Sequence, residues 1–176
     1  PYNYSAMSTH VAINYVIQKI GVDNYENFLK KIFTDHVGVK NDVHFSKVSW
    51  SKADDDKGNA RYTFFATSED YLRVAKTIMN DYHSDSCIGD YLRNIYDNRV
   101  KKKKKQDDTK SVFAYTKQYG GQFHMSLRGT KNVVFAMDGY AGQQILIDMT
   151  SGRIVIVHAI DRHYNWNKIV YKVIKN

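Results

Sequence analysis

The chain has 176 residues, and 43% of them are hydrophobic, so it can bury a core and fits one domain or most of one. Its formal net charge of +8 would suit nucleic acid, an anionic surface or an acidic substrate. The single cysteine, Cys87, excludes an internal disulfide and a cysteine-rich metal site. No apolar run approaches the roughly 18 residues that suggest a membrane span.

Two amphipathic helices are predicted at the start of the chain. The first carries apolar residues at spacings of three and four and ends at Gly21. Its N-cap candidates are Ser5, Ser8 and Thr9. The second helix takes Asn24 as its N-cap, and Gly38 follows its end.

The middle of the chain mixes short strands with two further helices. A strand is predicted near residues 43–50, and residues 61–66 form a strand or an extended lead-in. Thr67 and Asp70 have the spacing of a capping box, which predicts the start of a helix. Another short helix fits residues 87–96.

A run of five lysines at residues 101–105 supplies much of the positive charge. Like charges this close together repel each other and stay hydrated, which favours an exposed loop. No aromatic side chain is interleaved with the run, as a base-stacking surface would require. A loop is therefore the main interpretation, and a nucleic-acid contact is the alternative.

The remainder of the chain has the pattern of an antiparallel sheet followed by a helix. Residues 122–127 and 133–137 are predicted to pair across a turn. A hairpin follows, with arms at residues 144–149 and 153–160. Residues 164–174 have helical spacing and should pack their apolar face on the sheet. Helices, then three or four consecutive strands, then a terminal helix indicate an α+β fold.

The hairpin is the part of the sheet where a substrate site is predicted. Residues 154–157 are apolar on both faces, which is typical of a sheet covered on both sides. Upstream, Gly139 and Gly142 flank Tyr140-Ala141, and glycines at the entrance to a strand let the backbone approach a ligand closely. The alternative is that these glycines only relieve crowding in the turn.

Several short motifs occur along the chain in a recognisable order. Tyr4-Ser5-Ala6-Met7-Ser8 precedes the helix that closes at Gly21, and Tyr25-Glu26-Asn27-Phe28-Leu29 follows it. Thr67-Ser68-Glu69-Asp70-Tyr71-Leu72, Tyr119-Gly120-Gly121-Gln122-Phe123 and Asp138-Gly139-Tyr140-Ala141-Gly142-Gln143 come next. In this order they resemble the serine β-lactamase and DD-peptidase superfamily, nearest the class C-like branch of esterases and 6-aminohexanoate-dimer hydrolases.

The resemblance implies an antiparallel sheet flanked by helices plus a helical subdomain, and an acyl-enzyme mechanism on an ester, amide or peptide-like substrate. A Ser-x-x-Lys nucleophile would be activated by a Lys-Tyr pair, in which Tyr4 is the proton-relay tyrosine. The Gln143 backbone N–H would hold the oxyanion, and Tyr140, Ala141 and Gly142 would line the substrate cleft. Ser8 would offer a polar contact, and no cofactor is implied.

The sequence also departs from the pattern of these relatives. Ala6 stands where they often have Asn, and Tyr140-Ala141 supply neither a cation nor a hydroxyl, which argues against a true β-lactamase. The Ser-x-x-Lys match Ser49-Trp50-Ser51-Lys52 lies downstream of Tyr4, in a segment without helical pattern. We therefore expect residues 1–176 to be the C-terminal part of one such domain, mainly helical over 1–110 and sheet plus terminal helix over 111–176.

These expectations define the partners and the rival interpretations. The partners would be a small-molecule or peptide-like substrate and an upstream portion of the same enzyme that carries the nucleophile, so the chain alone would be inactive. The compartment cannot be read from the sequence, and the resemblance favours the periplasm over the cytoplasm. No nucleic acid is expected, because no aromatic side chain is interleaved with the lysine run. No metal is expected, because the histidines lack a metal-ligand spacing. The rival is a non-catalytic binding or cell-wall-associated relative.

Overall fold

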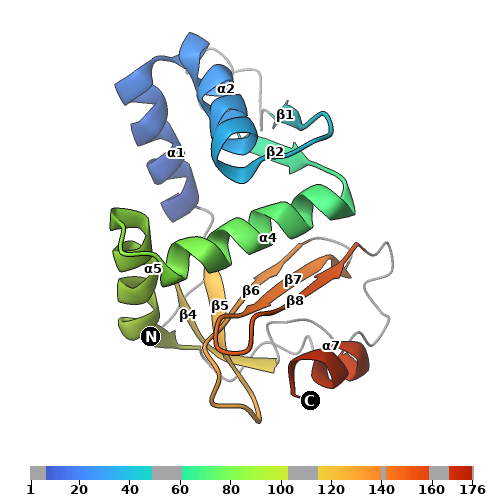
Figure 1. The fold of residues 1–176 in the computed structure, drawn as a ribbon. Helices are drawn as coiled ribbons and strands as arrows, with labels where there is room; N and C mark the ends of the chain where they lie inside the picture. Colours follow the sequence, from blue (N-terminus) through green and yellow to red (C-terminus); the bar gives the residue numbers. More distant parts are fainter. Residues whose placement is uncertain (1–6, 49–60, 103–114, 140–141, 159–166, 176) are drawn as a thin grey trace. The chain divides into compact units, whose positions relative to one another are not determined.

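The computed structural model describes residues 7–48, 61–102, 115–139, 142–158 and 167–175 (Figure 1). The chain forms two compact units, Tyr4–Val74 and Ala75–Asn176, which divide inside one helix. The expected Ser5 cap and the Ser49-Trp50-Ser51-Lys52 motif lie outside the described residues.

The first unit begins with two helices that meet at a glycine. α1 spans Met7–Ile20 and α2 spans Val22–Lys31, so the predicted end at Gly21 is confirmed. Gly21 has φ 87°, a left-handed conformation that lets the chain turn without a longer loop. This tight turn makes Gly21 the N-cap of α2, so the prediction of Asn24 as the cap was wrong. Asn24 instead donates from Nδ2 to the Ile20 carbonyl at 2.9 Å.

Two further sequence predictions in this unit need correction. Ser8 and Thr9 lie inside α1 and do not cap its described start. The second predicted helix is not uniform, because its last part is a π-helix, η1, at Ile32–Val37. Gly38 ends η1 with φ 72°, as its position after the apolar stripe predicted.

A short hairpin and a long helix complete the first unit. β1 (His44–Val48) pairs antiparallel with β2 (Arg61–Phe65), which confirms both predicted strands. α4 (Ser68–His83) begins at the predicted capping box. The Asp70 N–H donates to Thr67 Oγ1 at 3.2 Å, whereas the Asp70 carboxylate is used elsewhere, as described below.

The second unit is built on a six-stranded antiparallel sheet in which neighbours in sequence are neighbours in space. Its strands are β3 (Val100–Lys101), β4 (Thr116–Gly120), β5 (Phe123–Leu127), β6 (Val134–Asp138), β7 (Gln144–Asp148) and β8 (Arg153–Val157). The predicted α+β class is confirmed, and the sheet has more strands than the three or four expected.

The lysine run is where this unit differs most from the sequence prediction. Lys101 is exposed, as predicted, but it belongs to the strand β3 and not to a loop. Lys102 is half-buried and bonded to the sheet, so the prediction of exposure was wrong for this residue. The charge pattern alone did not show that the strand pairing of Val100 and Lys101 with β4 draws the next side chain inward. Residues 103–105 lie outside the described part of the chain.

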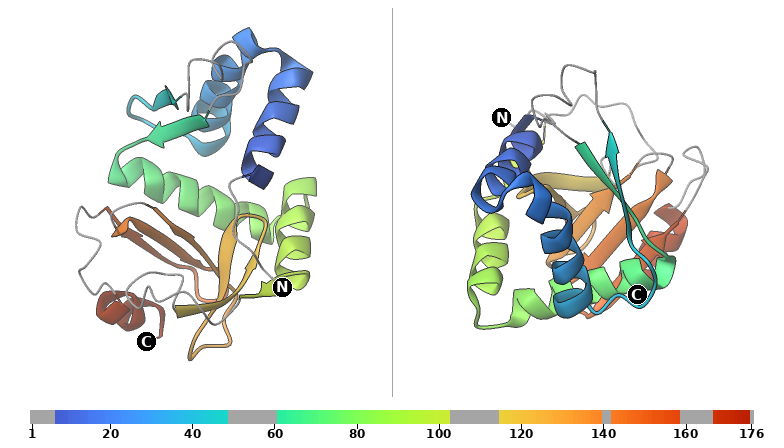
Figure 2. Two further views of the ribbon diagram at one scale, coloured as in Figure 1. Left: turned by 180° about the vertical axis from the view of Figure 1, so that it is seen from behind. Right: turned by 90° about the horizontal axis from the view of Figure 1, so that it is seen from above.

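Helices cover both faces of the sheet, as the apolar second arm of the hairpin predicted. On one face, Val155 and Val157 pack with Val170 and Ile174 of α7 (Asn167–Ile174). On the other face, Ile154 and Ile156 pack against a cluster that includes Ala75 of α4 and Leu92 of α5 (Cys87–Asp97). Figure 1 shows α7 and α5 on opposite sides of the strands, and the view from behind in Figure 2 agrees.

The predicted hairpin is formed by β7 and β8, and a buried aspartate closes its turn. Asp148 is fully buried. Its Oδ1 accepts from the Thr150 and Ser151 N–H groups at 2.9 and 3.0 Å. Its Oδ2 accepts from Ser151 Oγ and Asn132 Nδ2, each at 2.7 Å. These bonds fix the register of β7 against its neighbouring strands at the Asp148 end. The candidate site lies at the other end of β7.

Candidate functional site

The loop between β6 and β7 carries most of the predicted substrate-binding residues. Asp138 at the end of β6 pairs with Gln144 at the start of β7, so the loop is short and closed. The Gly139 N–H donates to the Gln143 carbonyl at 2.8 Å and ties its two ends together. The prediction of a strand entered through a glycine-bracketed segment therefore corresponds to a tight hairpin loop.

The two glycines of this loop have different structural roles. Gly142 has φ 87°, in the left-handed region that disfavours side chains. A Cβ on Gly139 would lie 2.9 Å from Gln143 Oε1 and 3.0 Å from Gln143 Cβ, so glycine allows the loop to close. Crowding thus accounts for Gly139, and Gly142 turns the main chain toward an exposed Gln143. A main-chain N–H group that is exposed at a turn is the type of group that binds an anion or an oxyanion.

Most of the other predicted site residues are not among those that the structure describes. Tyr4, Tyr140 and Ala141 lie outside the described residues. Ser8 lies in α1 of the first unit, and only its backbone is described. The convergence of Tyr4 with Gln143 on one cleft therefore stays a prediction.

Sequence reasoning missed a buried glutamine next to the loop. Gln144 is 2% exposed, and within the described structure neither its Oε1 nor its Nε2 has a hydrogen-bond partner. Its cross-strand neighbour Val157 packs in the cluster with α7, which places Gln144 on the same face of the sheet. A buried amide without partners is costly, so this position is the weakest point of the α7 face.

A second polar group on the α7 face was also missed, because its members are far apart in the sequence. Lys102 Nζ donates to Thr116 Oγ1 at 2.5 Å and lies 3.0 Å from His124 Nδ1. His124 is opposite Ala136, a member of the cluster that α7 covers. The protonated Lys102 amine can only donate, so in that state His124 Nδ1 accepts and the neutral ring carries its proton on Nε2.

Burial lowers the pKa of both Lys102 and His124. Burial, together with the nearby charge of Lys102, lowers the pKa of His124 to about 3. Burial also lowers the pKa of Lys102 to about 7, with Asp138 opposing the shift and Arg128 adding to it. At neutral pH the imidazole is therefore uncharged, and the amine is only partly protonated. The only sequence signal was the lysine run, which pointed toward solvent.

In the first unit, the buried carboxylate of Asp70 joins two distant segments. Asp70 is fully buried, and its oxygens accept from the Lys40 and Asn41 backbone N–H groups at 3.0 and 3.1 Å. It also accepts from Asn41 Nδ2 at 2.8 Å and pairs with Arg73 Nη1 at 2.6 Å. Burial alone would raise the pKa of Asp70, but these hydrogen bonds outweigh it and hold the pKa well below its usual value.

Among the described residues, no group of three or more His, Cys, Asp or Glu is placed to hold a metal ion. The described helices are all too short or too polar to cross a membrane. No protein-family model, curated protein or solved structure matches the sequence. Functional inference therefore depends on the geometry and on the sequence resemblance alone.

Proposed function

We propose that this chain provides the substrate-binding sheet of a serine hydrolase that resembles the β-lactamase superfamily and forms an acyl-enzyme on an ester, amide or peptide-like substrate. The β6–β7 loop carries the proposal. It is a hairpin loop closed by the Gly139–Gln143 hydrogen bond, and the exposed residue Gln143 follows the left-handed Gly142. The motif Asp138-Gly139-Tyr140-Ala141-Gly142-Gln143, on which the resemblance depends, lies at this loop.

The chemistry assigns a separate role to each group. A serine Oγ attacks the substrate carbonyl carbon and loses its proton to a Lys-Tyr pair, in which Tyr4 is the proposed tyrosine. The carbonyl oxygen becomes an oxyanion, and the Gln143 N–H donates to it. The proton then passes to the leaving group, and water releases the acyl group. The nucleophilic serine is proposed to belong to a Ser-x-x-Lys motif upstream of Tyr4.

The first unit is compatible with the resemblance. Two of its motifs, the segment that begins at Tyr25 and the helix start at Thr67, belong to the same compact unit. Asp70 of the second motif binds residues 40 and 41, which follow η1, and η1 continues from α2, the helix that contains the first motif. The two motifs thus lie on elements of one unit that the Asp70 hydrogen bonds join.

The test uses the product of the complete open reading frame beside the 176-residue chain. A fluorophosphonate probe and p-nitrophenyl ester turnover report an activated serine. The Gln143→Pro variant removes the backbone N–H, and the matched Gln143→Ala variant keeps it. Loss of one oxyanion donor lowers kcat by about a hundredfold or more. We expect that loss only in Gln143→Pro, with circular dichroism showing that both variants fold.

Three results would overturn parts of the proposal. Equal turnover of the two Gln143 variants would remove Gln143 from the oxyanion site. Turnover by the 176-residue chain that Ser49→Ala abolishes would assign the nucleophile to Ser49. Absence of any serine adduct and of any turnover would instead support a non-catalytic binding or cell-wall-associated relative. Ala6 and Ala141, which replace polar residues of the relatives, favour that second candidate.

A further inference from the structure

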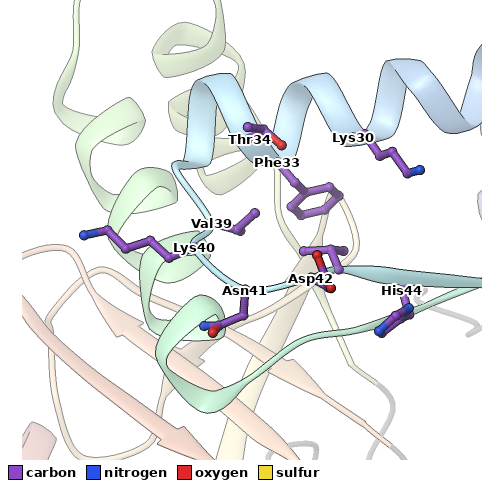
Figure 3. A pocket seen from close by; sticks show the side chains of 9 residues that line it. Lys30, Phe33, Thr34, Val39, Lys40, Asn41, Asp42 and His44 are labelled. Carbon is purple, nitrogen blue, oxygen red and sulfur yellow. The ribbon is translucent and has the colours of Figure 1, made fainter.

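A pocket of about 460 Å³ lies in the first unit, between the π-helix η1 and the segment that follows it (Figure 3). It is lined by Phe33 and Thr34 of η1, by residues 39–44, and by Lys30 at the end of α2. This volume is within the range of small-molecule sites. The pocket is unrelated to the β6–β7 loop, so the inference does not rest on the proposed hydrolase function.

The apolar wall of the pocket is held rigidly. The Phe33 ring stacks on Phe64 with centroids 4.4 Å apart and an interplanar angle of 16°. Phe64 in turn meets Tyr71 edge-on at 5.4 Å, and the Tyr71 hydroxyl donates to the Phe64 carbonyl at 3.0 Å. Such a stack fixes the Phe33 ring, whose exposed part is directed into the pocket in Figure 3.

The opposite wall is also held in place. Asp70 accepts from the Lys40 and Asn41 backbone N–H groups, which anchors the segment to the start of α4. The wall beside it is a π-helix, a rare form that is frequent at functional sites because its wider turn re-aims side chains. Preformed walls reduce the entropy that a ligand loses on binding.

The charges around the pocket are separated. In Figure 3 the Asp42 carboxylate lies below the Phe33 ring, whereas Lys30 on the helix and His44 on the strand both lie on the right-hand side of the view. The Lys40 ammonium is directed away from the centre of the pocket. The Asn41 amide is occupied by Asp70 and by Thr67. One acidic group and one basic end therefore face the same apolar wall.

We propose that this pocket binds a small zwitterion with an apolar side chain, that is, a free amino acid or a short peptide. The ligand's ammonium pairs with Asp42, its carboxylate is directed toward Lys30 and His44, and its side chain packs on Phe33. A purely cationic ligand would leave the basic end unpaired, and a purely anionic ligand would approach Asp42 with a like charge.

The experiment titrates the 15N-labelled chain with three ligands that share one ring, followed by NMR at pH 7. L-phenylalanine carries both charges, 2-phenylethylamine only the ammonium, and 3-phenylpropanoate only the carboxylate. We expect L-phenylalanine to bind at least threefold more tightly than either of the others, with shifts at Thr34, Val39 and Asp42. Equal or tighter binding of either singly charged ligand would overturn the zwitterion assignment, and so would shifts confined to other regions.

Two exposed side chains provide variants that should not disturb the fold. Asp42→Asn should weaken L-phenylalanine binding by about twofold to fivefold, the usual effect of one exposed ion pair. Lys30→Gln should have a similar effect on L-phenylalanine and none on 2-phenylethylamine. Asp35→Asn and Lys31→Gln, exposed neighbours that do not line the pocket, serve as controls. Unchanged affinity in Asp42→Asn would refute the proposed ammonium contact.

Discussion

Replacing Asp70 with asparagine should destabilise the first unit through a small number of identified hydrogen bonds. The substitution keeps the side-chain volume and removes one of the two acceptor oxygens. One set of donors then loses its acceptor, either Lys40 N–H with Arg73 Nη1 on Oδ1, or Asn41 N–H with Asn41 Nδ2 and Thr67 Oγ1 on Oδ2. Lys40 and Asn41 are exposed residues, so water can partly replace the lost acceptor. We therefore expect a loss of about 2 kcal/mol, from the lower part of the range for such groups.

The assay combines urea unfolding with hydrogen exchange. The backbone amides of Lys40 and Asn41 should exchange roughly thirtyfold faster in Asp70→Asn, the rate equivalent of about 2 kcal/mol. Asp35→Asn, an exposed position in the same unit, should change stability by less than about 0.5 kcal/mol.

The pH dependence of Asp70 has a defined sign. The pKa of Asp70 is lower in the folded state than its usual value of 3.8. The contribution of Asp70 to the free energy of unfolding is therefore fully present above pH 3.8 and is lost as the pH falls further. The stability difference between wild type and Asp70→Asn should therefore shrink from pH 6 to pH 3. A difference that is constant or grows on acidification would refute the reasoning, as would an Asp70→Asn variant as stable as Asp35→Asn.

Four further predictions concern the second unit. Gln144→Met should raise the free energy of unfolding by about 1 kcal/mol in a denaturant titration, because it removes two buried polar atoms that have no partner; a loss of similar size would show that the amide has one. The folded-state pKa of His124, about 3, is below its usual value of 6.5, so the free energy of unfolding should fall as the pH drops from 6.5 toward 3. Denaturant unfolding of His124→Gln over the same pH range should not show the part of this loss that is due to His124. The folded-state pKa of Lys102 is lowered to about 7, so stability should rise between pH 7 and pH 10; NMR titration of Nζ with a midpoint above 9 would contradict this. Gly89→Ala should lower the melting temperature more than Gly152→Ala. A Cβ at Gly89 would lie 2.3 Å from the Ser84 carbonyl oxygen, whereas a Cβ at Gly152 would meet no atom within 4 Å and would cost only the strain of its φ of 71°; equal effects would refute the packing argument.

Local sequence chemistry was sufficient for most of the elements. Hydrophobic spacing predicted α1 and α4, and the glycines at 21 and 38 predicted where helical segments end. The hairpin of β7 and β8 followed from two apolar runs around a Ser-Gly turn. These features depend on contacts between residues close in the chain, so a sequence window contains the information.

The candidate site was predictable only in part. The glycine-bracketed segment identified the β6–β7 loop, but not the hydrogen bond that closes it or the buried Gln144 beside it. The π-helix was not visible, since its apolar pattern is compatible with an ordinary helix. The lysine run suggested a solvated loop, although Lys102 is bonded to Thr116 and His124 in the sheet.

The sequence by itself determined the class of fold, the order of its elements and the position of the loop that is proposed to bind substrate, because periodicity and turn residues act locally. Tertiary structure alone decided which polar groups are buried together. Asp70 meets Lys40 across 30 residues of sequence, and Lys102 meets His124 across 22. Their charge states follow from burial and from partners brought close by folding, and neither is recorded in any stretch of neighbouring residues.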